Sequence, residues 1–178
     1  MPDMKLSGIL TVKKAAILKK WFDVIMESYP SGTSNHLNIQ GDSFANPTGA
    51  TISRGIEGIF EELLRGPNGQ TPSEFPGDIV RIMAVQDLLP SRALAFFFSL
   101  KKIIREELRA EMTEELSHEI FSLEARIDCL TLSAFDIFMK CREKIYEIRA
   151  NELKRANFRH LQKADVMDSA PKANKILP

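Results

Sequence analysis

The sequence predicts an all-α protein: a single-domain helical bundle with a long C-terminal helix. Apolar residues recur at intervals of three and four along most of the chain, which is the period of an α-helix. Proline and glycine concentrate in residues 30–49 and 66–77, which are therefore expected to separate helical segments. Residues 113–163 contain neither proline nor glycine, and this stretch predicts one long helix.

Four helices are predicted before the long one, each with an apolar face. The first is expected to stop before Pro30, because a residue that precedes proline is disfavoured in the α conformation. Pro90 separates the third from the fourth, whose stretch 93–98 is apolar all round and is predicted to be buried on all sides. These predicted helices cover residues 11–29, 51–65, 78–88 and 91–112.

The domain predicted from this pattern spans residues 11–163. We expect a flexible N-terminus over residues 1–10, and a disordered tail over residues 164–178, which is short, polar and contains proline. Residues 31–51 form a loop rich in turn-forming residues.

The long predicted helix carries two apolar stripes on neighbouring faces. A helix of about 75 Å is longer than a domain of this size, which spans about 35 to 40 Å. Part of the helix is therefore expected to leave the domain or to pack in a homodimer. The longer stripe comprises Leu116, Ile120, Leu123, Ile127, Leu130, Ala134, Ile137, Cys141, Ile145 and Ile148, and the second Leu132, Phe135, Met139 and Tyr146. The interface candidates are Leu132, Phe135, Met139, Ile145 and Ile148.

Charge is balanced overall but uneven along the chain. The 24 basic and 24 acidic residues cancel, which gives no general reason to expect binding to nucleic acid or to an anionic membrane. Residues 106–128 hold eight acids and two bases, whereas residues 140–163 hold eight bases and three acids. One interpretation is a solvated helix face. The other is an antiparallel dimer in which the two regions meet, or a docking surface for a charged partner.

Motifs for catalysis or for cofactor binding are missing from the sequence. The three histidines are isolated, and no CxxC, GxGxxG, P-loop or GxSxG motif occurs. We therefore expect no enzymatic activity, no metal and no haem. Cys129 and Cys141 lie on one predicted helix about 18 Å apart, too far for a disulfide. No apolar segment is long enough to span a bilayer. These features together predict a cytoplasmic protein without membrane insertion.

Four polar residues stand among apolar neighbours and are candidate ligand-binding or buried polar positions: Arg81, Gln86, Asp128 and Arg142. In one interpretation they sit at the edge of the core and reach water, or bridge adjacent backbone. In the other, a buried paired charge defines a ligand pocket or a helix register. Asp128 and Arg142 project in nearly the same direction about 21 Å apart. In an antiparallel dimer with its two-fold axis near Phe135, Asp128 of one chain would meet Arg142 of the other.

Several segments resemble the N-terminal domain of RsbRD-type proteins, over residues 11–155. They are Trp21-Phe22 with Tyr29-Pro30, residues 44–49, residues 80–87 with Pro90-Ser91, Leu100-Lys101, and residues 134–138 with residues 141–144. This resemblance implies a sensory subunit of the stressosome, with a dimeric, globin-like helical fold that lacks haem. In RsbR-type proteins a long helix leads to a STAS domain with phosphorylated threonines, and this sequence holds no counterpart of either.

We therefore predict a non-enzymatic regulatory sensor or adaptor in stress or in redox and energy signalling. It would act through dimerisation and through binding of an unidentified protein partner. The alternative is a small-molecule binding protein with a pocket between helices, in which Arg81 or Arg142 contacts an anion or metabolite.

Overall fold

The computed structural model describes residues 5–27, 47–65, 75–86 and 88–168 of the chain. All regular elements in this part are helical, which confirms the predicted all-α fold with a long C-terminal helix. In chain order they are α1 (Leu6–Glu27), α3 (Pro47–Arg65), α4 (Phe75–Val85), α5 (Pro90–Ala93), α6 (Ala95–Glu107), the 3-10 turn η1 (Arg109–Glu111) and α7 (Glu114–Asp168).

The chain divides into two compact units within α7. The first unit is Met1–Cys141 and the second is Arg142–Pro178. The domain predicted over residues 11–163 includes residues of both units, and its bounds stay a prediction. The second unit consists, where described, of the last part of α7. In the part of the chain that the structure describes, no helix combines the length and the hydropathy that a membrane span requires.

Several predicted helix ends are wrong. Helix α1 begins at Leu6, and Leu6, Ile9 and Leu10 are buried, so the expected flexible N-terminus does not hold for residues 6–10. The reason is that these apolar residues continue the buried face of the helix towards the N-terminus. Helix α3 begins at Pro47, within the predicted loop, because proline is well tolerated in the first turn of a helix. Helix α7 continues to Asp168, so residues 164–168 of the expected tail are helical.

The predicted helix over residues 91–112 is broken at Leu94. This residue has φ −105° and ψ −2°, and it separates the short α5 from α6. The expected burial of residues 93–98 on all sides is also wrong. Phe96 and Phe97 are buried, but Phe98 is 56% exposed, because it lies on the same helical face as the exposed Lys102 and Arg105.

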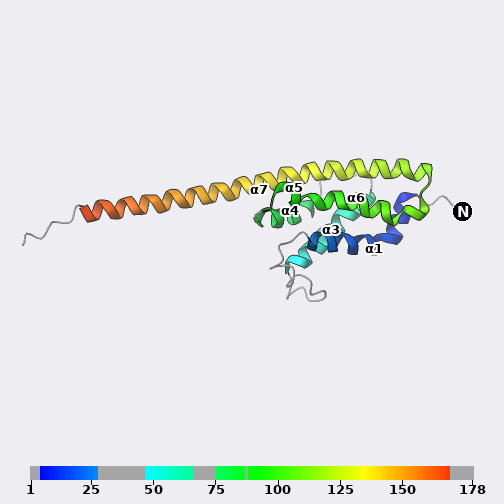
Figure 1. Cartoon of the computed structure of the whole chain (residues 1–178), viewed down its shortest axis with the longest axis horizontal. Helices are drawn as coiled ribbons and strands as arrows, with labels where there is room; N and C mark the ends of the chain where they lie inside the picture. The colour runs from blue at the N-terminus through cyan, green and yellow to red at the C-terminus, as the bar shows by residue number, and fades with distance from the viewer. Residues whose placement is uncertain (1–4, 28–46, 66–74, 87, 169–178) are drawn as a thin grey trace, which may run out of the picture. The chain divides into compact units, whose positions relative to one another are not determined.

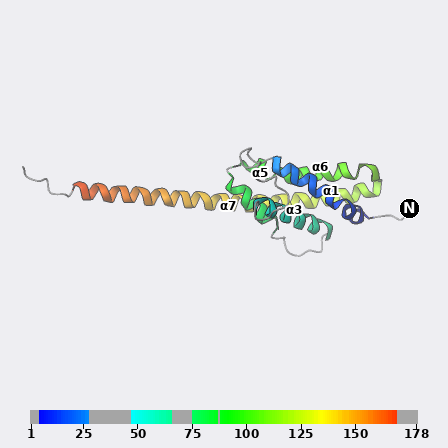
Figure 2. The same cartoon turned by 90° about the horizontal axis from the view of Figure 1, so that it is seen from below.

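The core of the first unit lies between α1, α3, α4, α6 and the first part of α7. Figure 1 shows that part of α7 lying along α6, with α1 and α3 on the other side of α6. Figure 2 shows α1 and α3 side by side. Trp21 is fully buried at the centre, where its Nε1 donates to the Phe96 carbonyl oxygen at 2.7 Å. The indole thus satisfies its one donor while filling the largest core position.

The longer predicted stripe of α7 packs on this core as far as Cys141, whereas Ile145 and Ile148 belong to the second unit. Leu116, Ile120, Leu123, Ile127 and Ala134 are buried, while Leu130, Ile137 and Cys141 are partly buried against the same cluster. Thr131 is also buried on this side, and its hydroxyl is satisfied because Oγ1 donates to the Ile127 carbonyl oxygen at 2.7 Å. Packing along this stripe therefore holds the first half of α7 to the domain.

Candidate functional site

A second apolar stripe of α7 lies on the solvent side of the first unit. Phe121 is 73% exposed, Leu132 69%, Phe135 42% and Met139 36%. We name this surface the α7 stripe and define it by positions that alternate steps of four and three, the spacing of a coiled-coil seam. It comprises Phe121, Ala125, Asp128, Leu132, Phe135 and Met139. The sequence predicted that this face would be covered, and the single chain leaves it open.

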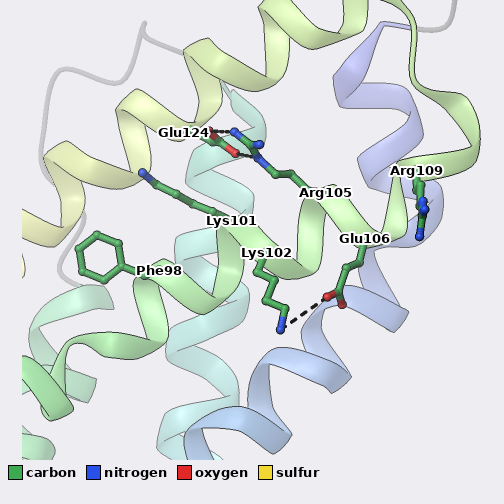
Figure 3. A pocket seen from close by; sticks show the side chains of 7 residues that line it. All are labelled: Phe98, Lys101, Lys102, Arg105, Glu106, Arg109 and Glu124. Atoms are coloured by element: carbon green, nitrogen blue, oxygen red, sulfur yellow. Dashed lines mark hydrogen bonds and ion pairs between the residues drawn. The ribbon is translucent and has the colours of Figure 1, made fainter.

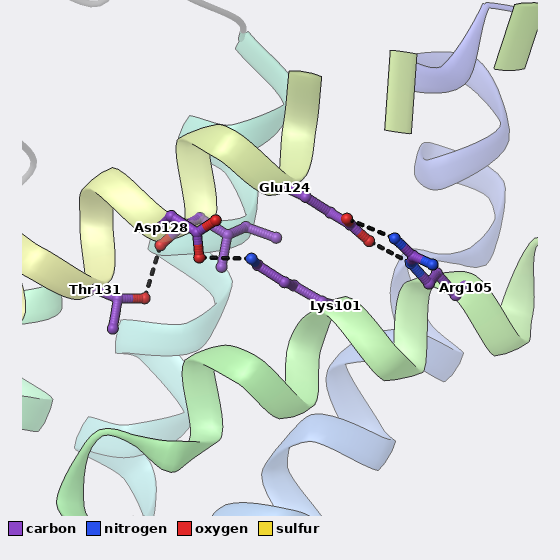
Figure 4. Close-up of polar contacts among 6 residues, drawn as sticks. Lys101, Arg105, Glu124, Asp128 and Thr131 are labelled. Carbon is purple, nitrogen blue, oxygen red and sulfur yellow. Dashed lines mark hydrogen bonds and ion pairs between the residues drawn. The ribbon is translucent and has the colours of Figure 1, made fainter. Parts of the chain in front are cut away.

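Two ion pairs, one of them formed by Asp128 of the α7 stripe, connect α7 to α6. Lys101 Nζ donates to Asp128 Oδ1 at 2.5 Å. Arg105 donates two hydrogen bonds to Glu124, from Nε to Oε1 at 2.5 Å and from Nη2 to Oε2 at 2.8 Å, as Figure 4 shows. A bidentate arginine–carboxylate pair fixes the orientation of the two side chains relative to each other as well as the distance between them. These pairs therefore help to set the rotation of α7, and with it the face that α7 turns to solvent.

The Glu124 carboxylate is nearly buried, although its arginine partner is mostly exposed. The hydrogen bonds from Arg105 lower the pKa of Glu124 below its usual range, and they outweigh burial, which acts in the opposite direction. A carboxylate with a lowered folded-state pKa contributes stability above its unfolded pKa, near 4.3 for a free glutamate. That contribution is lost as pH falls through the folded-state value.

Glu124→Gln should therefore cost about 1 kcal/mol of unfolding free energy at pH 7, because Arg105 is free to turn towards water once its partner is neutral. The difference between variant and wild type should shrink as pH falls below about 4. Urea unfolding of both proteins at pH 7, 5 and 3.5 measures this difference in unfolding free energy. A difference that does not change with pH would contradict a role for the Glu124 charge.

A shallow basic groove of about 550 Å³ runs along α6 beside these ion pairs (Figure 3). Four cations and two acids line it together with Phe98, whose ring centroid lies 5.8 Å from Lys101 Nζ. The charged residues are Lys101, Lys102, Arg105, Arg109, Glu106 and Glu124. Because Lys101 joins this groove to Asp128, the groove and the α7 stripe meet at one ion pair.

The four predicted polar residues have separate partners. Arg81 pairs with Asp78 at 3.1 Å, and both side chains are exposed. Gln86 is half-buried at the end of α4, where its backbone N–H donates to the Met83 carbonyl oxygen at 3.2 Å. Asp128 is half-buried and bound to Lys101 of its own chain. An Asp128–Arg142 pair between chains is thus not needed to satisfy Asp128, and it stays a prediction.

The second unit holds the remaining predicted residues. Arg142 is half-buried, and its Nη2 donates to the Tyr146 hydroxyl at 2.8 Å. Ile145 is half-buried, and Ile148 is 48% exposed. Leu153 and Phe158 are exposed in the same unit. Apolar residues therefore continue at exposed positions beyond the α7 stripe.

Sequence reasoning missed two exposed aromatic residues, Phe98 and Phe121. The signal for Phe121 is the same alternation of four and three that leads from Asp128 back through Ala125. The signal for Phe98 is the polar face that it shares with Lys102 and Arg105, four and seven residues further along the same helix. In the described part of the chain no cluster of three His, Cys, Asp or Glu residues could hold a metal ion. Both cysteines are free thiols, and His118 is exposed.

Comparison with known proteins places this helical arrangement in a family. The sequence model of the RsbT co-antagonist protein rsbRD N-terminal domain matches residues 15–153, a range that includes the whole α7 stripe. An uncharacterized protein of Archaeoglobus fulgidus is 28% identical over 125 residues, which cover 68% of this chain and 78% of that protein. No solved structure matches the chain at a significant level. The protein belongs to the RsbRD N-terminal domain family of stressosome-related signalling domains.

Proposed function

We propose that the protein is a non-catalytic sensor or adaptor module that self-associates through the α7 stripe and passes its signal to a protein partner. The observation that carries the proposal is the exposure of Leu132 and Phe135 on a seam with coiled-coil spacing. Exposed apolar surface of this kind is typical of a protein–protein interface. Membership of a family of signalling domains supports the regulatory role.

A second copy of the chain is the occupant that fits the stripe best. A two-fold axis near Phe135 sets the first part of α7 opposite the last part of the partner's α7. The acidic residues of 114–128 on α7 of one chain then face the basic residues that follow position 140 on α7 of the other. An isologous contact of this kind uses the same surface on both chains, so each contact between two residues occurs twice, once on either side of the two-fold axis. Charge complementarity selects the antiparallel orientation.

Cross-linking distinguishes this orientation from a parallel dimer. In a background of Cys129→Ser and Cys141→Ser, Phe135→Cys should form an intermolecular disulfide on oxidation, because the two residues meet at the axis. Phe121→Cys is the matched control on the same stripe, and it should not cross-link to itself. Sedimentation equilibrium of the wild type should give a homodimer at micromolar concentration.

A monomer in sedimentation at these concentrations would contradict the proposed self-association. Equal cross-linking of Phe121→Cys and Phe135→Cys would instead support a parallel pair, since a parallel seam places every equivalent residue together. The role as an adaptor would then stand with a different geometry, and the charge argument would fail.

A further inference from the structure

A half-open cleft of about 400 Å³ lies where three helices of the first unit meet, away from the α7 stripe. The first turns of α1, the last turns of α3 and the first half of α7 form its walls. Its volume falls in the range of small-molecule sites. The walls combine a leucine-rich lining with a few polar groups, and the residues used below are Lys5, Leu10, Leu63, Glu119, Leu123 and Arg126.

The floor of this cleft is apolar and well packed. Leu10, Leu63 and Leu123 come from three different helices and are all nearly fully buried. Since they also belong to the hydrophobic core, the floor is held in place by the fold itself. Such a surface binds hydrocarbon and offers no hydrogen bond from its side chains.

Arg126 supplies a cation at the side of the same cleft. Its side chain is half-buried, and burial lowers the pKa of its guanidinium with no contribution from a neighbouring acid. An arginine stays charged in proteins, so Arg126 carries a desolvation cost that no carboxylate of the described residues offsets. Arg105 on α6, by contrast, has such a partner in Glu124.

Among the described residues, Glu119 is the one acid that lines the cleft, and it already accepts a hydrogen bond. Its Oε2 accepts the backbone N–H of Leu6 at 3.0 Å, at the start of α1. That carboxylate thus satisfies a helix N-terminus and leaves the Arg126 charge uncompensated. With Lys5 also at the cleft, the balance of formal charge there is one positive.

We propose that this cleft binds an amphipathic monocarboxylate, whose hydrocarbon chain lies on the leucine floor and whose carboxylate pairs with Arg126. The planar guanidinium matches a carboxylate in a bidentate geometry. A ligand with this chemistry removes the main unfavourable feature of the cleft, the half-buried and unpaired Arg126 cation, while its hydrocarbon chain fills the space beside the leucines. The idea that this ligand is the signal that the module senses rests on the proposed function. The binding of the ligand to the cleft does not depend on that function.

The test is calorimetric titration of the full chain with octanoate, and with butanoate and hexanoate for the effect of chain length. Each added methylene should tighten binding up to about fourfold. Acetate, which has the charge without the chain, and 1-octanol, which has the chain without the charge, should both bind much more weakly than octanoate.

Arg126→Gln should weaken octanoate binding about ten- to hundredfold, because it removes charge-assisted hydrogen bonds. Arg92→Gln is the matched control, since Arg92 is exposed on α5 and does not line the cleft. Thermal unfolding separates a binding role from a structural one. The melting temperature of Arg126→Gln should equal or exceed that of the wild type, because a poorly solvated charge has been removed.

Three results would overturn the inference. They are affinity that does not depend on chain length, octanoate binding that Arg126→Gln leaves unchanged, and a melting temperature lowered by Arg126→Gln without ligand. None of these results bears on self-association, which the cross-linking and sedimentation experiments measure separately. Loss of the dimer with octanoate binding intact would contradict the proposed function alone.

Discussion

Trp21→Ala should lower the free energy of unfolding by about 3 to 5 kcal/mol. Trp21 is fully buried between α1 and α6, where it packs against the Phe96 ring at a centroid distance of 5.9 Å. Alanine would leave a cavity in the core and remove the hydrogen bond to the Phe96 carbonyl oxygen. Chemical unfolding followed by circular dichroism measures the change, since the variant loses the single tryptophan.

Two control variants separate volume from hydrogen bonding. Trp21→Phe keeps much of the ring but not the donor, so we expect an intermediate loss of about 1 to 3 kcal/mol. Val12→Ala changes an exposed position of the same helix and should stay within about 0.5 kcal/mol of the wild type. A loss for Trp21→Ala no larger than that for Val12→Ala would show that the indole does not support the core.

Phe135→Glu should weaken the proposed dimer at least a hundredfold. The substitution puts a carboxylate from each chain at the two-fold axis, where the two like charges lie close together and away from water. An unpaired charge buried in an interface costs on the order of 3 to 5 kcal/mol, and each 1.4 kcal/mol corresponds to a factor of ten in affinity. Sedimentation equilibrium over a concentration series measures the dissociation constant.

The matched control is Val12→Glu, which introduces the same charge at an exposed apolar residue of α1. It should leave the dimer unchanged. Phe135→Glu should keep the wild-type circular dichroism spectrum, because Phe135 is 42% exposed within its own chain. Ile145→Glu should also weaken the dimer more than it disturbs the fold. If Phe135→Glu dimerises as tightly as the wild type, the interface does not include the α7 stripe.

The α6–α7 ion pairs connect these two predictions. Arg105 and Lys101 attach α7 to the helix that also accepts the Trp21 hydrogen bond. Core packing on one side of α6 and the ion pairs on the other therefore fix how α7 is rotated. That rotation decides that Phe135 faces solvent and Ala134 faces the core.

The sequence by itself determined the helical fold and the approximate place of the breaks between most helices. Glycine and proline mark the breaks between α3, α4 and α5, because proline lacks a donor and glycine is flexible. The period of the longer stripe identified Ile120, Leu123 and Ile127 as core, which the structure confirms. Periodicity succeeds here because a helix exposes one face at a fixed angular step, whatever it packs against.

Only the tertiary structure decided what the polar residues meet and which apolar residues of α7 a single chain leaves exposed. The spacing made Leu132 and Phe135 interface candidates, and the packed helices leave them exposed while Ala134 is buried. The helix break at Leu94 likewise could not be predicted, because no proline or glycine lies at that position. The partners of Asp128 and the cleft at Arg126 depend on residues distant in sequence, such as Lys101 and Leu10. Such contacts form only after the helices pack, because nothing in the local sequence specifies which side chains from other helices will be near.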